Sequence, residues 1–175
     1  LIDRTPMWDL MVQQGVFDLH TFTSGDRLEP FDGVSIEPVR VPHRAELSDM
    51  HAFVVRGPEK SLLYLPDHDT WSETLTSQHT NSLREWFTKL GIDVALIDGT
   101  FWSDSELGER NQAKVPHPPV SETLELLGPK SSNDPEIFFI HLNHTNPLYD
   151  ESSEEFHKVQ SLGWGVAKQG QRFTL

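Results

Sequence analysis

The sequence contains no cysteine, and this absence excludes two kinds of structure. Disulfide bonds cannot form, and thiolates cannot serve as metal ligands. Any metal ion in this protein would therefore be held by histidine, aspartate or glutamate side chains.

Long apolar runs are also missing. No stretch approaches the roughly 20 apolar residues that a membrane-spanning helix needs, and no charged start followed by a short apolar segment indicates a signal peptide. We therefore expect a cytoplasmic protein without a membrane partner. The sequence opens on Leu1 rather than on methionine, and Thr5-Pro6 predicts that a capped helix begins within the first few residues. From these two observations we expect a fragment of a longer chain.

Basic residues are few. The 175 residues include 14 Lys and Arg against 27 Asp and Glu, which gives a formal net charge of -13. This charge repels polyanions, so we expect no nucleic-acid partner. The length is about that of one domain, and there is no internal repeat or linker, so we treat residues 1–175 as a single unit.

The hydrophobic pattern places hairpins first and then helices that alternate with buried strands. The predicted strands are 33–41, 52–55, 62–65, 94–97, 137–142, 165–167 and 171–174. The predicted helices begin near Thr5 and at 81 and 121, and a last one follows a capping box that starts at Ser152. The segment 102–119 reads as a loop. This order predicts an α/β protein with sheet layers flanked by helices.

Titratable side chains follow four of the predicted strands. His43, Asp67, Asp98 and His141 each lie at a strand end. Ligands gather at the carboxyl edges of strands in layered sheets, because the framework there is rigid while the loops vary. His43, Asp67 and His141 could therefore meet at one Zn, Mn or Fe ion. The alternative is that each is a surface or capping residue, and the sequence LPDHD could form an Asx turn.

Two further histidines are candidates for proton transfer. His117 lies between prolines in VPHPP, which restricts the backbone and aims the ring. His144 follows His141 by three positions, and Pro147 favours a loop that brings both rings to one pocket. His144 could then be a ligand, an acid or the group that orients His141.

Four segments resemble one known family. They are VPHRAELSDMHAFVVRGPEKSLLYLPDHDTW, ALIDGTFW, VPHPPVSETLELL and FFIHLNHTNPLYD. Together they resemble the second half of the coenzyme PQQ synthesis protein B family, within the metallo-β-lactamase superfamily, from about residue 34 to about residue 150. The resemblance implies the carboxyl-terminal half of an αββα sandwich.

The resemblance also implies roles for the site residues. The segments are similar to those of tRNA 3′-processing endonucleases and phosphodiesterases, in which His43, Asp67 and His141 match metal ligands. His117, supported by Asp98, matches a histidine that assists phosphodiester cleavage. The superfamily's first metal motif, H-x-H-x-D-H, is absent from the sequence. We expect it upstream if the chain is a fragment; otherwise the site has lost much of its ligand set.

Three functions follow from the resemblance. The first is a metal-dependent enzyme of pyrroloquinoline quinone (PQQ) biosynthesis that oxidises a tyrosine-derived precursor, with Fe or Zn as the divalent metal and with His144 or His117 carrying protons. The second is a hydrolase of phosphodiesterase or lactonase type. The third is a non-enzymatic carrier of the quinone. The expected substrate is a small molecule or derives from a short peptide, and a homodimer is left open.

Overall fold

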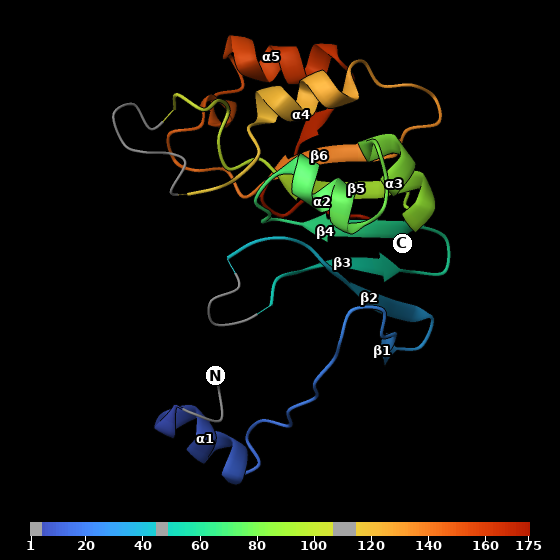
Figure 1. The fold of residues 1–175 in the computed structure, drawn as a ribbon, viewed down its shortest axis with the longest axis vertical. Helices are drawn as coiled ribbons and strands as arrows, with labels where there is room; N and C mark the ends of the chain where they lie inside the picture. The colour runs from blue at the N-terminus through green and yellow to red at the C-terminus, as the bar shows by residue number, and fades with distance from the viewer. Residues whose placement is uncertain (1–4, 45–48, 107–114) are drawn as a thin grey trace.

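The computed structural model describes residues 5–44, 49–106 and 115–175. The described residues form one sheet whose strands lie side by side in chain order (Figure 1). The strands are β1 (Leu28–Phe31), β2 (Val34–Arg40), β3 (His51–Arg56), β4 (Ser61–Leu65), β5 (Val94–Asp98), β6 (Glu136–Ile140) and β7 (Gly165–Val166). The predicted α/β class with layered sheet and helices is confirmed.

The direction of the strands places the helices on one face. Strands β1 to β4 pair antiparallel, whereas β4 to β7 pair parallel. Parallel neighbours need crossover connections, which are almost always right-handed, and successive steps in one direction put every crossover on the same face. The crossovers contain α2 (Trp71–Ser77), α3 (Leu83–Leu90), α4 (Val120–Leu127), the 3₁₀ turn η3 (Pro147–Tyr149) and α5 (Glu154–Ser161). Figure 1 shows these helices stacked along β4 to β7.

The hydrophobic core lies between the helices and the sheet. Alternate strand residues, such as Leu63, Ile97 and Phe139, are fully buried on the helix side. Trp71 and Trp86 from the helices complete the same cluster, with their rings packed edge to face. Alternation with period two therefore sends every second strand residue into this core.

The opposite face of the sheet carries aromatic side chains that are less deeply buried. Tyr64 is 42% exposed. The segment after β7 crosses this face, where Phe173 packs on Phe138 with ring centroids 5.4 Å apart. On the same face, over β3, Phe22 packs on Phe53 with ring centroids 6.0 Å apart. Two irregular segments thus cover part of a face that has no helix layer among the described residues.

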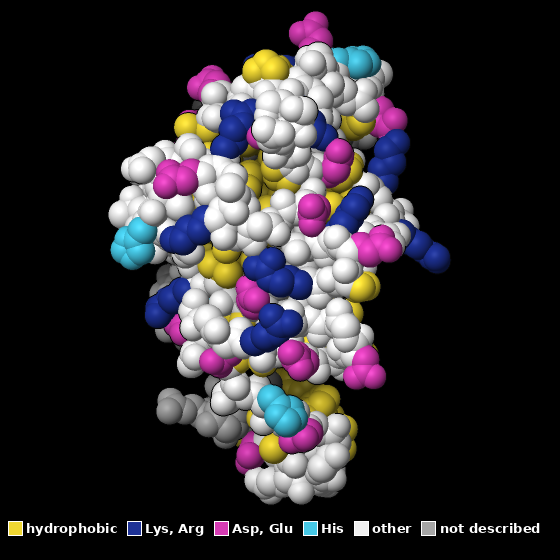
Figure 2. Space-filling view, turned by 90° about the vertical axis from the view of Figure 1, so that its right-hand side faces the viewer, with side chains coloured by type: hydrophobic (Ala, Val, Ile, Leu, Met, Phe, Trp, Pro, Cys, Tyr) yellow, Lys and Arg dark blue, Asp and Glu magenta, His cyan; other side chains and the backbone are white. Residues whose placement is uncertain are grey.

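The first helix stands apart from the sheet. Helix α1 (Pro6–Gln13) begins at Pro6 as predicted, and none of its residues is buried. It forms the separate lobe at the bottom of Figures 1 and 2. None of the helices in the described part of the chain is long and apolar enough to cross a membrane.

Two predicted elements need correction. The N-cap of α5 is Ser153, whose hydroxyl accepts from the Phe156 N–H, and not Ser152. The Ser152 hydroxyl donates to Asp150 at 2.6 Å, so it closes the preceding turn instead. The predicted closing strand at 171–174 is wrong, because that segment forms no strand and lies across the aromatic face. Strand β7 has only two residues.

Strand β1, helix α2 and the 3₁₀ turn η3 were not predicted. Strand β1 is a four-residue edge strand that contains Pro30, so its pattern is too short to read. Helix α2 begins after Thr70, whose side chain accepts from the Glu73 N–H. The expected loop at 102–119 forms no helix or strand at 102–106 and 115–119, and its part at 107–114 lies outside the described residues.

Charged side chains on the face shown in Figure 2 alternate in sign rather than forming a basic stripe. Arg56 of β3 pairs with Glu37 of β2 at 3.0 Å. Arg84 of α3 donates from Nε and Nη2 to the two carboxylate oxygens of Asp134, both at 2.8 Å. The bond to Arg84 lowers the pKa of Asp134 to about 2. This bidentate pair fastens α3 to the loop before β6.

Replacing Asp134 with asparagine should reveal the pH dependence of this pair. The folded-state pKa lies below the ordinary value near 3.9, so the stabilisation is complete above about pH 4 and is lost as pH falls toward 2. We expect Asp134→Asn to lower the free energy of unfolding by about 1–2 kcal/mol at pH 7 and by about half of that at pH 3. Urea unfolding at both pH values measures it. Asp18→Asn, at an exposed position, is the control, and equal losses at both pH values would contradict the assignment.

Candidate metal centre

The carboxyl edge of the parallel strands gathers the candidate residues. Asp98 is the last residue of β5, and it lies opposite Ile140, the last residue of β6. His141 comes next in the chain. Asp67 follows β4 by two residues. The parallel register therefore brings Asp67, Asp98 and His141 to one edge of the sheet. Their positions at the ends of predicted strands had indicated the same edge.

Four side chains form a cluster that could hold a metal ion. Asp67, Asp98, His117 and His141 each offer one ligand atom, and these atoms lie within 4.8 Å of one another. Oδ1 of Asp67 lies at the centre, 3.5 Å from Nδ1 of His117 and 3.8 Å from Nδ1 of His141. Nε2 of His43 approaches the same oxygen to 3.5 Å. Two donors on one tetrahedral zinc ion lie about 3.3–3.6 Å apart, and the separation of His43 Nε2 from Asp67 Oδ1 falls in this range.

His43 reaches the cluster from the end of β2. Its Nδ1 lies 3.0 Å from Oδ1 of Asp69, and its Nε2 faces Asp67. A carboxylate on one ring nitrogen orients the other nitrogen toward a metal. The three residues predicted as metal ligands, His43, Asp67 and His141, are thus brought together, and their role as ligands stays a prediction. Asp69 was not predicted, although it stands in the same sequence stretch, LPDHD.

His117 and Asp98 form a buried pair beside the cluster. Nδ1 of His117 lies 2.7 Å from Oδ2 of Asp98, and their side chains are 7% and 0% exposed. Burial lowers the pKa of His117, but the hydrogen bond and charge of Asp98, together with the charge of Asp67, outweigh it and raise the pKa above its ordinary value. A ring whose raised pKa keeps it protonated to higher pH than an ordinary histidine can serve as an acid. The two predicted residues are thus in contact, and their catalytic role stays a prediction.

His141 has a strained backbone. Its φ is +61°, in the left-handed region that residues other than glycine seldom adopt. Such strain tends to occur where a side chain must be aimed at a functional site. Nδ1 of His141 contacts the Thr100 hydroxyl at 2.9 Å. Thr100 was not predicted, and its only sequence signal was the turn Asp98-Gly99-Thr100 after a buried strand.

His144 does not join the cluster. It is exposed, and the expectation that both rings share a pocket is not supported. The loop is held by buried Asn146, whose side-chain amide donates to the Gly99 carbonyl at 2.7 Å and whose carbonyl oxygen accepts from the Leu148 N–H at 2.9 Å. This bridge turns residues 143–146 so that His144 lies on the outside of the loop.

His68 follows Asp67 in the chain, and its side chain is bonded within the core. It is fully buried, with Nδ1 2.9 Å from the Thr74 hydroxyl and its ring edge-on to Trp71. Burial lowers its pKa to about 4, so the ring is neutral at pH 7. Its backbone N–H donates to Asp98 at 3.4 Å, which connects the core to the cluster.

Gly99 is required by the close approach of β5 and β6. A methyl group at this position would lie 2.9 Å from Cβ of Phe139 and 3.0 Å from the carbonyl oxygen of Ile140. Because these atoms belong to the core and the backbone, they cannot retreat. We expect Gly99→Ala to lower the free energy of unfolding by about 1–3 kcal/mol and to weaken zinc binding about tenfold, since Asp98 and His141 move apart.

Calorimetric zinc titration and urea unfolding measure both effects. Gly170→Ala is the control, because Gly170 has φ +81° with nothing within 4 Å of the added methyl. It should cost stability without changing zinc affinity. Unchanged zinc affinity in Gly99→Ala would show that the strand ends tolerate the methyl group.

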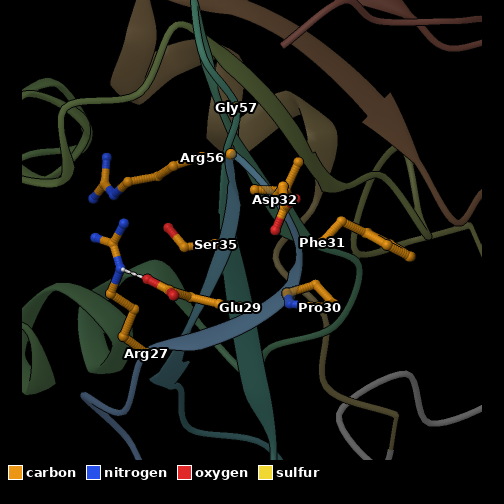
Figure 3. Close-up of a pocket in the computed structure, with 10 residues that line it drawn as sticks. Arg27, Glu29, Pro30, Phe31, Asp32, Ser35, Arg56 and Gly57 are labelled. Carbon is orange, nitrogen blue, oxygen red and sulfur yellow. Dashed lines mark hydrogen bonds and ion pairs between the residues drawn. The ribbon is translucent and has the colours of Figure 1, made fainter.

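Two cavities differ in their relation to the cluster. One of about 450 Å³ is bordered by His43, Pro42, Arg40 and Gln78. The other, of about 390 Å³, lies at the opposite edge of the sheet between the β1–β2 turn and Arg56, and none of the cluster residues lines it (Figure 3). Its arginines are engaged by nearby carboxylates: Arg27 by Glu29 and Arg56 by Glu37. The cavity beside His43 is therefore the relevant one for chemistry at the cluster.

Comparison with known proteins agrees with this geometry. The family described as β-lactamase superfamily domain matches residues 4–141, well over half of the chain. The chain belongs to the metallo-β-lactamase superfamily. The motifs predicted the αββα sandwich of this superfamily. The described residues form one helix layer and one sheet of such a sandwich.

Relatives within this superfamily confirm the resemblance to coenzyme PQQ synthesis protein B. The protein of that name from Nitrosococcus oceani is 31% identical over 163 residues, which is 86% of this chain and 49% of the relative. The one from Methylobacterium sp. (strain 4-46) is 32% identical over 70% of this chain and 40% of the relative. The chain spans about half the length of the curated relatives that it matches.

Solved structures show the same fold. The Zn²⁺-bound PqqB of Methylobacterium extorquens superposes with a TM-score of 0.74 at 23% identity, covering 99% of this chain and 61% of that one. An isothiocyanate hydrolase from Delia radicum gut bacteria gives a TM-score of 0.59 at 15% identity, covering 95% and 63%. The expected divalent metal is consistent with the donor set, since imidazole and carboxylate groups suit zinc and iron.

Proposed function

We propose that this chain carries the metal-binding, carboxyl-terminal half of a protein that acts in PQQ biosynthesis. The observation that supports this most is the position of Asp67 Oδ1, which faces His43, His117 and His141 at 3.5–3.8 Å. The likeness to PQQ synthesis protein B over 86% of the chain supports the pathway. The Zn²⁺-bound structure of PqqB supports zinc as one of the metals.

In this proposal the residues of the chain have two roles, metal binding and proton transfer. His43, Asp67 and His141 would hold the ion, as two imidazoles and a carboxylate that leave further positions open. When bound, the ion supplies a Lewis acid, and in the case of iron also a redox centre. Asp69 orients His43, and Asp98 orients His117 and raises its pKa. His117 would then hold or release a proton at Nε2, which is the ring nitrogen that Asp98 leaves free.

The proposed reaction is oxidation of a tyrosine-derived precursor with dioxygen as the oxidant. The cavity of about 450 Å³ beside His43 falls within the usual range for small-molecule sites. The proposed substrate is therefore a small molecule or a short peptide derivative, and we propose no nucleic-acid partner for a chain of net charge -13. We propose that His117, in its neutral form, takes the phenolic proton at Nε2.

Anaerobic reconstitution tests this proposal. The protein would be loaded with Fe²⁺ or Zn²⁺, desalted and analysed for bound metal, and the iron form would then be exposed to dioxygen with the precursor. We expect about one metal per chain, with oxidised product from the iron form alone. No retained metal would contradict the proposal, and tight binding of the quinone without turnover or metal would favour the carrier function instead.

A second candidate function is hydrolysis, and the buried His117–Asp98 pair favours it. An acid at this place can protonate a leaving oxygen while a bound cation lowers the pKa of water. Structural neighbours include two hydrolases, although their identity to this chain is 15–16% and shows the fold alone. Turnover of bis-p-nitrophenyl phosphate by the zinc-loaded protein would support hydrolysis over oxidation.

A further inference from the structure

Thr100 makes contacts that the proposed chemistry does not use. It is 6% exposed and lies just beyond β5. Its hydroxyl donates to Oδ1 of Asp98 at 2.7 Å and lies 2.9 Å from Nδ1 of His141 and 3.2 Å from Nδ1 of His117. One hydroxyl therefore touches three members of the cluster.

The number of protons restricts how these contacts can be made. A hydroxyl has one proton to donate and two lone pairs that accept, and an ionised carboxylate can only accept. Oδ1 of Asp98 takes the Thr100 backbone N–H at 2.9 Å as well as the hydroxyl. With its proton given to Asp98, the Thr100 oxygen can only accept from a ring nitrogen.

The two imidazoles are not equivalent in this respect. Nδ1 of His117 lies closer to Oδ2 of Asp98, at 2.7 Å, than to the Thr100 hydroxyl at 3.2 Å. Its proton therefore goes to Asp98. His141 has no carboxylate within 3.5 Å of Nδ1 among the described residues, so the Thr100 oxygen is its acceptor. His141 must then carry its proton on Nδ1.

We propose that Thr100 is a positioning residue that sets the tautomer of His141. With the proton on Nδ1, the lone pair of the ring is on Nε2, which becomes the atom available to a metal. The hydrogen bond also fixes the ring on a residue whose backbone is held at φ +61°. This inference rests on the proposed function only where it concerns metal affinity, because the tautomer is a property of the metal-free protein.

Nitrogen NMR of the metal-free protein tests the tautomer directly. Long-range ¹H–¹⁵N spectra at pH ~8.5, where ordinary imidazoles are neutral, distinguish protonated from bare ring nitrogens. We expect His141 as the Nδ1–H form in the wild type. Thr100→Val keeps the shape and removes the hydroxyl, so His141 should shift toward the Nε2–H form. Thr100→Ser keeps the hydroxyl and should restore the Nδ1–H form, which separates positioning from packing.

Zinc titration of the same variants measures the consequence. We expect Thr100→Val to bind zinc about tenfold more weakly and Thr100→Ser to bind like the wild type, as for other groups that orient a ligand. The inference is overturned if wild-type His141 is the Nε2–H form, or if Thr100→Val changes neither tautomer nor affinity. A third outcome is that neither the wild type nor any variant binds zinc, while the His141 tautomer still changes when the Thr100 hydroxyl is removed. In that case the proposed metal function fails and the role of Thr100 in setting the tautomer stands.

Discussion

Replacing Asp67 with asparagine is expected to weaken zinc binding by about 100-fold or more. Oδ1 of Asp67 lies within 3.8 Å of ring nitrogens of His43, His117 and His141, and its negative charge would stabilise a cation there. Asparagine keeps the size of the side chain and removes the charge. Because the charge of Asp67 also raises the pKa of His117, the variant should lower that pKa.

Calorimetric zinc titration and a proton NMR titration of His117 measure the two effects, with circular dichroism to verify the fold. Asp69→Asn is a matched control two residues away. Its carboxylate contacts Nδ1 of His43, the ring nitrogen that does not face Asp67, so about a tenfold loss is expected. Asp18→Asn, 89% exposed, should have no effect. Equal losses for Asp67 and Asp69 would place the centre of the site elsewhere.

The position of this site could be predicted because strand ends are visible in sequence. Buried parallel strands appear as continuous apolar runs, and the residue after such a run lies at the carboxyl edge. Val94 to Ile97 and Ile137 to Ile140 are runs of this kind, so Asp98 and His141 could be assigned to one edge before their neighbours were known.

The features that could not be predicted depend on contacts between distant segments. The outward turn of His144 follows from the bond of Asn146 to the carbonyl of Gly99, 47 residues earlier. The contact of Asp69 with His43 spans 26 residues. Spacing along the chain carries no information about such bonds. Local sequence restricts the φ and ψ angles of a segment, but it does not determine which other loop packs against that segment. The same reason explains why Thr100 appeared only as part of a turn.

Short elements fail for a different reason. Strand β1 has four residues, one of them Pro30, which is less than the window needed to distinguish alternation from chance. The closing strand predicted at 171–174 had a plausible composition, yet Phe173 finds its partner in Phe138 on the face of the sheet rather than at its edge. Side-chain packing decided that segment, and backbone pairing did not.

Replacing His117 with glutamine should lower any hydrolytic rate by about 100-fold or more, the usual contribution of a positioned acid. The pKa of His117 is raised by Asp98, so the protonated ring persists to higher pH than for an ordinary histidine. If the ring acts as an acid, the rate should be constant at low pH and fall as pH rises through that raised pKa. The rate of bis-p-nitrophenyl phosphate hydrolysis as a function of pH, with saturating zinc, measures both.

Two further variants distinguish the loss of a proton donor at His117 from an unspecific loss of activity. Asp98→Asn removes the charge that raises the pKa, so the falling limb of the pH profile should move to lower pH while the histidine remains. His144→Gln makes the same chemical change at the exposed histidine outside the cluster and should leave the rate unchanged. A rate that rises through the pKa of His117 would instead assign the neutral ring as a base. Equal losses for His117→Gln and His144→Gln would mean that the loop, and not the buried pair, delivers the proton.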